Sequence, residues 1–214
     1  MKKMKYWRPA VLFMLVLLVT ICPMEAQAAS KKTKAIKAYK AMLSEKTMRW
    51  GLDTYYKAVP TDKCSFTIAY IDNDSVPELI VYSGYVSRPA GNMLIYTYRN
   101  GKAQAVKNTV TGRYYADGGE FSYYRKKGIF ISCYCAGGVT DNYCRMSRNK
   151  AGYKLKADNS LMYGKSYYRC AGEKMKKITK KDFDKALKKL VGSKKKTTAK
   201  FYKNTASNRK KYLK

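Results

Sequence analysis

Three carboxylates, Asp72, Asp74 and Glu78, lie close together in one short stretch of the sequence. Carboxylate oxygens are hard ligands of the kind that calcium prefers, and a tight turn can point alternate side chains at one centre while the backbone adds a carbonyl. If Glu78 closes a nine-residue loop, Asp72 and Asp74 take its third and fifth places and the Val76 carbonyl takes its seventh. The spacing therefore predicts a metal site formed by Asp72, Asp74, Val76 and Glu78, with calcium as the cofactor.

Two other interpretations of this loop start from the same residues. An EF-hand loop beginning at Asp72 fails, because its fifth position would be Val76 and its twelfth would be Ser83 rather than glutamate. An Asx-type turn would use Asp72 and Asp74 only to bond the nearby backbone, without any ion. The Asx turn stays open as the alternative to a metal site.

Two strands must hold this loop in place. Residues 66–82 predict a strand, a tight loop and a buried strand, because Asp72, Asn73, Asp74 and Pro77 interrupt two apolar runs rich in β-branched and aromatic residues. We therefore expect the chain to be organised around a central hairpin whose turn carries the carboxylates.

Helices are expected near both ends of the chain, with short strands between them. Apolar residues fall near one face of residues 31–50, and residues 178–191 form a second helix capped by Thr179 and ended by Gly192. Beyond the central hairpin, strands are predicted at 93–98, 103–107, 121–124, 129–135, 142–146, 153–156 and 166–169. The fold class is therefore α+β, an antiparallel β-meander with an N-terminal helix and a C-terminal helix or helices.

The chain divides into a leader, a domain and a tail. A basic start and a short apolar stretch precede Ala26-Gln27-Ala28, the small-residue pattern of a signal peptidase site. Residues 1–28 are predicted to be a signal peptide cleaved after Ala28, residues 29–192 a single α+β domain and residues 193–214 a basic C-terminal extension. We expect a secreted or wall-associated protein with no stable membrane span after cleavage; Ile21 before Cys22 argues against a lipid anchor.

The charge of the chain indicates its partners. The formal net charge is +31, and removal of the leader leaves 41 basic and 13 acidic residues, a net charge of +28. Such a field attracts polyanions, and we expect anionic polymers such as teichoic acid or polysaccharide. Tyrosine recurs beside arginine, in pairs that could stack rings and hold anions: Tyr98 and Arg99, Tyr124 and Arg125, Tyr168 and Arg169. Strand-end tyrosines followed by basic turns would produce the same pattern without a ligand.

Five cysteines follow the leader. In an exported protein a disulfide is the first expectation. If residues 138–141 form a hairpin turn, Cys135 lies opposite Cys144, which predicts a Cys135–Cys144 bridge. A zinc site lacks both the usual Cys-x-x-Cys spacing and any histidine.

The loop also resembles a known family. Residues 72–79, DNDSVPEL, resemble the D-x-D-x-D-G-x-P-[DE]-L loop of FG-GAP and VCBS-type repeats, and the resemblance implies calcium binding. The first aspartate of that pattern is Tyr70 here and its glycine is Ser75, which implies a weak site. The whole arrangement of leader, lysine-rich helix, loop and Tyr-rich strands resembles uncharacterised secreted proteins of Gram-positive gut anaerobes.

The leading hypothesis is an exported cationic binding or structural module with a degenerate calcium loop. The absence of histidine excludes His-dependent triads. The absence of a phosphate-binding loop and of zinc-finger spacing argues against sequence-specific nucleic-acid recognition. The alternative is a wall-polymer or polysaccharide hydrolase that uses carboxylates, with Asp117 and Glu120 in the Asp-Gly-Gly-Glu run as the candidates.

Overall fold

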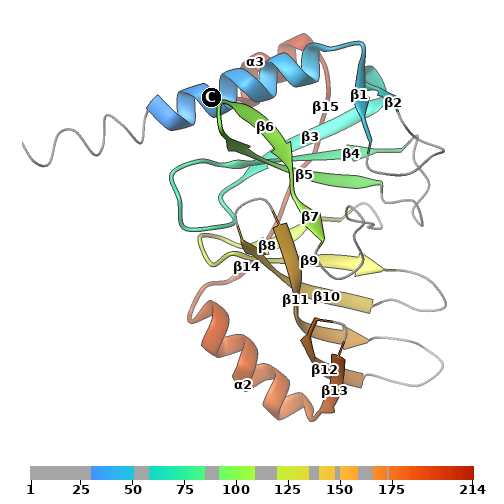
Figure 1. The fold of residues 1–214 in the computed structure, drawn as a ribbon, viewed down its shortest axis with the longest axis vertical. Coiled ribbons are helices and arrows are strands. Elements are labelled where there is room, and N and C mark those ends of the chain that lie inside the picture. Colours follow the sequence, from blue (N-terminus) through green and yellow to red (C-terminus); the bar gives the residue numbers. More distant parts are fainter. Residues whose placement is uncertain are drawn as a thin grey trace, which may run out of the picture.

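The computed structural model describes residues 30–50, 58–84, 92–108, 120–134, 140–147, 150–158, 166–172 and 174–214, without the side chains of 108, 133 and 134. The protein is β-rich and belongs to the predicted α+β class, with helices near both ends of the chain and mostly antiparallel strands between them (Figure 1). The predicted signal peptide lies outside the described residues. Among the described residues, no helix is both long and apolar enough to cross a bilayer.

The central hairpin forms the middle of a five-stranded sheet ordered β15-β3-β4-β5-β6. Its strands are β3 (Cys64–Ala69), β4 (Glu78–Ser83), β5 (Met93–Arg99), β6 (Lys102–Ala105) and β15 (Tyr202–Lys203). The turn between β5 and β6 has positive φ at Asn100 and Gly101, the geometry that makes Asn-Gly a hairpin signal. The predicted strand, loop and strand at 66–82 and the hairpin after it are confirmed.

A second sheet of eight strands is ordered β13-β12-β11-β10-β9-β8-β14, with β7 parallel to β11 beside this path. Its strands are β7 (Lys107–Asn108), β8 (Ser122–Tyr124), β9 (Ile129–Tyr134), β10 (Thr140–Ser147), β11 (Lys150–Asp158), β12 (Ser166–Ala171), β13 (Lys174–Ile178) and β14 (Lys196–Thr198). A small sheet pairs β1 (Thr47–Arg49) with β2 (Ala58–Pro60), which the 3-10 turn η1 (Thr61–Lys63) follows. The expected meander is therefore split into separate sheets.

The two large sheets pack face to face between helices. Ile80 and Ile95 of the five-stranded sheet share a buried cluster with Phe130 and Met146 of the eight-stranded sheet. The opposite face of the five-stranded sheet packs on the helix at residues 30–44. Helix α2 (Lys180–Val191) covers the outer face of the eight-stranded sheet. The fold thus has four layers, helix, sheet, sheet and helix (Figure 1).

The second predicted helix forms as expected. Thr179 caps α2 by accepting a hydrogen bond from the backbone N–H of Asp182, and the helix ends at Gly192, whose φ is +63°. Phe183 and Val191 are buried against the sheet. The apolar stripe and the two end signals were therefore sufficient to place this helix.

The N-terminal helix is shorter than its apolar pattern suggested. Ile36, Tyr39 and Leu43 are buried, as predicted, but the helix ends at residue 44. Trp50 is also buried, although the chain reaches it through strand β1 rather than through helix. Trp50 matched the helical spacing only by coincidence. It is buried because side chains alternate along an extended chain, which places Met48 and Trp50 on the same side.

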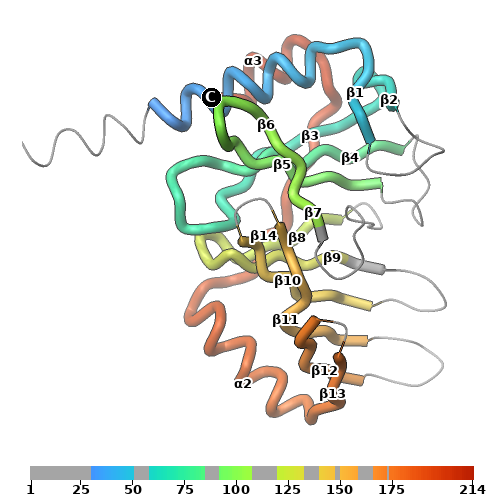
Figure 2. The backbone as a smooth tube through the Cα atoms, viewed as in Figure 1, coloured from blue at the N-terminus to red at the C-terminus, as the bar shows by residue number. Residues whose placement is uncertain are grey.

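The predicted boundary at residue 192 is wrong, because residues 193–214 are part of the fold. β14 pairs with β8 in one sheet and β15 pairs with β3 in the other. Asn204 is buried and donates hydrogen bonds from Nδ2 to the carbonyls of Leu43 (2.8 Å) and Thr61 (2.9 Å). Helix α3 (Ala206–Tyr212) follows and leads to the fully buried Leu213. Figure 2 shows this segment running from α2 back to the N-terminal helix.

The predicted Cys135–Cys144 bridge is also wrong. Cys144 has a free, buried thiol, and its Cα partner on β9 is Phe130. The pairing continues to Thr140 opposite Tyr134, so Thr140 and Asp141, which were assumed to lie in the turn, belong to β10. Cys135 itself lies outside the described residues. Side-chain alternation then directs Cys144 into the core between the two sheets.

Candidate metal centre

The loop between β3 and β4 is built on backbone hydrogen bonds from its own aspartates. The strand register pairs Ala69 with Glu78, so residues 70–77 form the connection. Asp72 Oδ1 accepts from the N–H of Asp74 (3.0 Å), and Asp74 Oδ1 accepts from the N–H of Val76 (2.7 Å). These contacts are the Asx turns that the sequence left open as an alternative. Each aspartate keeps a second carboxylate oxygen that these two bonds do not use.

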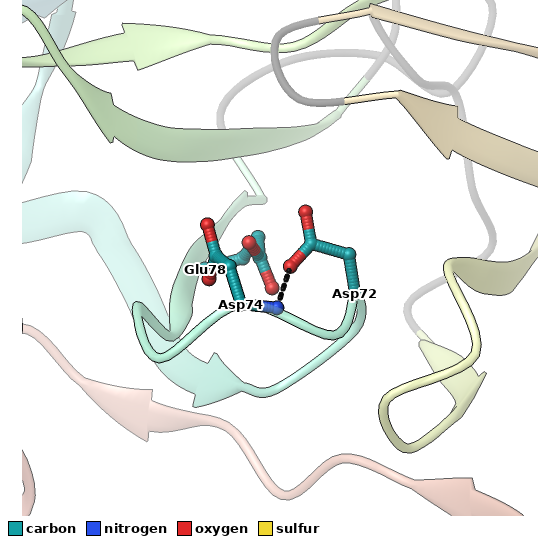
Figure 3. A group of neighbouring side chains, drawn as sticks. All are labelled: Asp72, Asp74 and Glu78. Carbon is teal, nitrogen blue, oxygen red and sulfur yellow. Dashed lines mark hydrogen bonds between the residues drawn. The ribbon is translucent and has the colours of Figure 1, made fainter. Parts of the chain in front are cut away.

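The loop brings three carboxylates together. One carboxylate oxygen from each of Asp72, Asp74 and Glu78 lies within 4.8 Å of the others. Figure 3 shows the three side chains gathered on one side of the loop. Asp74 is exposed, Asp72 is half-buried and Glu78 is fully buried, so the group runs from solvent to the protein interior. Like charges at this separation repel one another unless a proton or a cation intervenes.

Glu78 is the most constrained member of the group. Its side chain has 0% exposure, and Oε2 accepts a hydrogen bond from the N–H of Ile71 (2.9 Å). The other oxygen, Oε1, is buried and has no hydrogen-bond partner in the part of the chain that the structure describes. A buried carboxylate oxygen without a partner is costly, because burial removes the water that would otherwise solvate it. This oxygen therefore requires a proton or a ligand.

The protonation equilibria of the cluster agree with its geometry. Burial raises the pKa of Glu78 well above its usual range, the charge of Asp72 raises it further, and the hydrogen bond from Ile71 partly opposes the shift. Burial also raises the pKa of Asp74, against the hydrogen bond from Val76. Both shifts mean that the site disfavours uncompensated negative charge, which a bound cation would compensate.

The N-terminal helix contacts the loop from one side. The Tyr39 hydroxyl donates to the carbonyl of Pro77 (2.9 Å), beside Glu78. Burial raises the pKa of Tyr39, and so does the charge of Glu78, which keeps this hydroxyl protonated as a donor. The charge of Lys31 acts on Asp74 in the opposite sense and lowers its pKa, as a smaller effect.

The second sheet contacts the loop from the other side. The backbone N–H of Lys126 donates to the Tyr70 carbonyl (2.9 Å), and that of Gly128 donates to the Ile71 carbonyl (2.7 Å). The Arg125 guanidinium lies 5.4 Å from the centre of the Tyr70 ring. Tyr70, which stands where the family pattern has an aspartate, thus fixes the loop to the neighbouring sheet instead of offering a ligand.

Val76, the fourth predicted ligand, is placed differently from the three acids. It is buried in the cluster that the N-terminal helix covers, and its N–H donates to Asp74. Ligation through the Val76 carbonyl stays a prediction. The carboxylates of Asp72, Asp74 and Glu78 are the donors that the structure brings together.

The three Tyr–Arg pairs lie in three separate places. Tyr98 packs against the core beside the N-terminal helix, and Tyr124 is buried in a cluster beneath α2. Tyr168 is half-buried on β12, far along the second sheet, and Arg99 and Arg169 are exposed. Alternation along a strand sends neighbouring side chains to opposite faces, so these pairs do not form one surface. Arg125 lies over the ring of Tyr70.

Glu120, the candidate acid of the hydrolase hypothesis, connects two strands. Its Oε1 accepts from the hydroxyls of Ser122 (3.3 Å) and Thr198 (3.4 Å), on β8 and β14. Burial raises the pKa of Asp141, and the charge of Glu120 adds to that shift. Asp117 lies outside the described residues. The structure therefore gives Glu120 a carboxylate neighbour on β10 that the sequence did not indicate.

Several contacts around the loop had no sequence signal. The unpartnered oxygen of Glu78 depends on which strand face buries it, and the bonds from Lys126 and Gly128 depend on how two sheets meet. Only the continuous apolar run after Glu78, residues 79–82, indicated that its strand would be buried on both faces.

Comparison with known proteins leaves the site to be interpreted from its geometry. No protein-family model, no curated protein and no solved structure matches this chain.

Proposed function

We propose that this protein is an exported, cationic module that binds anionic polymers, and that its acidic loop holds a structural calcium ion. The observation that carries the polymer part is the exposure of its lysines. All twelve lysines of residues 174–200 are exposed, and this stretch contains two aspartates and no arginine. The leader predicted at residues 1–28 supports export, and polymers outside the cell are then the available polyanions.

Binding to a wall polymer tests this proposal directly. The protein without residues 1–28 should sediment with purified wall that carries poly(glycerol phosphate) chains. It should be released by about 1 M NaCl, because salt at that strength reduces the Debye length to about 3 Å. Wall stripped of those chains is the matched control. Retention in high salt with release only by detergent would contradict the proposal and point to a membrane.

The calcium part rests on Glu78: its buried Oε1 lacks a partner among the described residues, and its carboxylate lies beside an oxygen of Asp72 and one of Asp74. Three carboxylates supply hard oxygen ligands, and the exposed side of the loop leaves room for water to complete the coordination sphere. The loop lacks the first aspartate of the pattern that it resembles, so we expect a dissociation constant of about 10⁻⁴ to 10⁻³ M, as in extracellular modules. The ion would link residues at both ends of the loop and stabilise the hairpin.

A melting experiment tests the calcium site. Calcium at about ten times its dissociation constant should stabilise the protein by about 1.4 kcal/mol. That raises the melting temperature by about 3–6 °C in a domain of this size. Magnesium at the same concentration and NaCl at the same ionic strength are the controls. Glu78→Gln should abolish the shift, whereas Asp62→Asn, on an exposed residue outside the loop, should preserve it. Equal shifts in both variants would contradict the site.

A second candidate function is hydrolysis of a wall polymer, favoured by the electrostatic contact between Glu120 and Asp141. Two neighbouring carboxylates can act as general acid and base in glycoside hydrolysis. Zymography on wall polysaccharide checks it: clearing that Glu120→Gln abolishes would support hydrolysis. The absence of clearing by the unmodified protein would exclude it for the substrates used.

A further inference from the structure

The positive charge of the protein is concentrated in two outer layers. We call residues 174–200 the α2 pole, and residues 30–50 with 201–214 the N-terminal pole. The α2 pole has twelve lysines and two aspartates, and the N-terminal pole has twelve lysines and arginines and one glutamate. The 83 described residues between the poles have twelve basic and seven acidic residues. The middle of the protein is thus far less charged than either pole.

The helices of the two poles lie on opposite sides of the protein, and residues 194–203 connect them, with Lys200 Nζ 6.0 Å from the centre of the Tyr202 ring. Ala35, Tyr39 and Leu213 of the N-terminal pole pack on the outer face of the five-stranded sheet. Phe183 and Val191 of the α2 pole pack on the outer face of the eight-stranded sheet. The inner faces of both sheets pack on each other. Figure 1, drawn with the longest axis vertical, shows the helices of the N-terminal pole at the top and α2 at the bottom.

The lysines of α2 are electrically independent of the lysines on the N-terminal helix and on α3. Packed layers lie about 10 Å apart, so outer helices separated by two sheets lie about 30 Å apart. The Debye length at physiological salt is about 8 Å, so the field of either group of lysines is screened well before it reaches the other. A polymer segment attracted by one group therefore gains little from the charge of the other.

The helix itself explains only some of the lysines of α2, such as Lys188 in its last turn, where a cation favours the helix dipole. Lys181, Lys185 and Lys189 are exposed and follow one another at i,i+4 spacing, a like-charge arrangement that destabilises a helix. Of the two aspartates of this pole, Asp184 pairs with Lys180 and Asp182 accepts from the Thr179 hydroxyl. Repulsion within the row formed by Lys181, Lys185 and Lys189 thus lowers the stability of the helix, and a bound anionic partner would reduce that repulsion.

The chemistry of the α2 pole fits a flexible phosphodiester polymer. Lysine binds phosphate as a point charge on a flexible stem, whereas arginine forms fixed two-pronged contacts. The α2 pole has lysine alone, and its one exposed large apolar side chain among the described residues is Met175. It therefore offers no exposed aromatic ring on which a base could stack.

We infer that each pole binds its own stretch of polymer, so that one protein molecule crosslinks two phosphodiester chains. This inference rests on the proposed polymer binding and goes beyond it, since a module with a single binding face would coat a chain without joining it to another. Two linked sites also raise the overall affinity for a polymer network, because the second contact is effectively intramolecular.

Three charge-matched variants test the inference with synthetic poly(glycerol phosphate). The α2-pole variant changes Lys181, Lys185, Lys188 and Lys189 to Gln. The N-terminal-pole variant changes Lys34, Lys37, Lys210 and Lys211 to Gln. The control changes four exposed lysines between the poles, Lys102, Lys107, Lys150 and Lys154, to Gln. Gln is a good helix former, so the helices should persist, which circular dichroism verifies.

The unmodified protein and the control should form large crosslinked particles with the polymer, seen by light scattering at low salt. Each single-pole variant should still bind, in discrete complexes that do not grow. A single-pole variant that crosslinks as well as the control would overturn the inference. So would an unmodified protein that binds the polymer without crosslinking, which would leave the proposed function intact. No binding at all, or binding only to anionic phospholipid vesicles, would instead refute the proposed function.

Discussion

The central hairpin and the α2 pole use the same chain in opposite ways. Residues 64–83, which contain β3 and β4, have no lysine or arginine and three carboxylates, and their strands are buried on both faces. The α2 pole has twelve lysines, all of them exposed. The hairpin is therefore specified by burial, and its charged loop is an exception that requires compensation. The α2 pole packs on the core through a few apolar residues, and its other residues are mostly exposed and charged or polar.

This contrast separates stability from binding. Changes in the hairpin should alter the free energy of unfolding and leave polymer binding intact in the folded protein. Changes in the α2 pole should do the reverse.

The largest loss is expected for Ile80→Ala on β4. Ile80 has 0% exposure in the cluster between the two sheets, so its truncation leaves a cavity and should cost about 3 kcal/mol. Met175→Ala on β13 is the matched change in the α2 pole, where the side chain is 58% exposed, and should cost less than about 0.5 kcal/mol. Urea denaturation followed by circular dichroism measures both. Equal losses would break the contrast between the regions.

Asn204→Ala tests whether the C-terminal segment belongs to the core. The substitution leaves the buried carbonyls of Leu43 and Thr61 without this donor, which should cost about 2 kcal/mol. Ser207→Ala, on an exposed residue of α3, is the control and should be within about 0.5 kcal/mol of the unmodified protein. Urea denaturation again gives the free energies. An Asn204→Ala protein as stable as the control would show that residues 193–214 add little to the fold.

The acidic loop should make stability depend on pH when a chelator is present. Because the pKa of Glu78 is raised in the folded protein, its contribution is complete below the unfolded-state pKa of about 4.3 and is lost as pH rises through the native pKa. Between these two values the loss approaches about 1.4 kcal/mol per pH unit. The difference between the unmodified protein and Glu78→Gln isolates this slope from other groups, and calcium should reduce it. Asp62→Asn should retain it; a pH-independent difference would contradict the assignment.

The smallest effect is expected for Lys185→Gln in α2. Removing its repulsion with Lys181 and Lys189 should raise the free energy of unfolding by about 0.5 kcal/mol. Polymer affinity should fall at the same time, which sharpens the division between stability and binding. Lys154→Gln on β11 is the control and should change neither by as much. Thermal unfolding and polymer titration at one salt concentration measure the two quantities, and a loss of stability would contradict the argument.

The sequence was sufficient for the parts of the fold that depend on local signals. The hairpin turn at Asn100 and Gly101 and the capped helix after Thr179 formed as predicted, because each depends on residues within one or two turns. The three carboxylates of the candidate site were predictable from local spacing in the same way. Asp72 and Asp74 make their local turns, and the spacing brought Glu78 to them.

The failures concern contacts between distant segments. Strand β13 lacks an apolar alternation, since its residues from Lys174 to Lys177 are exposed, and it forms because β12 offers an edge. The lysine-rich run at 193–200 resembled a tail, yet its strand β14 pairs with β8, which lies far earlier in the sequence. The register of strands so far apart in the sequence is set by tertiary packing, because a one-residue shift would turn every side chain of the strand to the opposite face. A short window of sequence contains no signal for that packing.

The route of the C-terminal segment has a consequence for biosynthesis. Both large sheets depend on strands that lie after residue 193, and Leu213 fills a position in the core beside the N-terminal helix. A chain still emerging from the ribosome therefore lacks the pieces that close either sheet, and long-range pairing of this kind is slow to form. We therefore expect both sheets to close only after residues 193–214 have been synthesised.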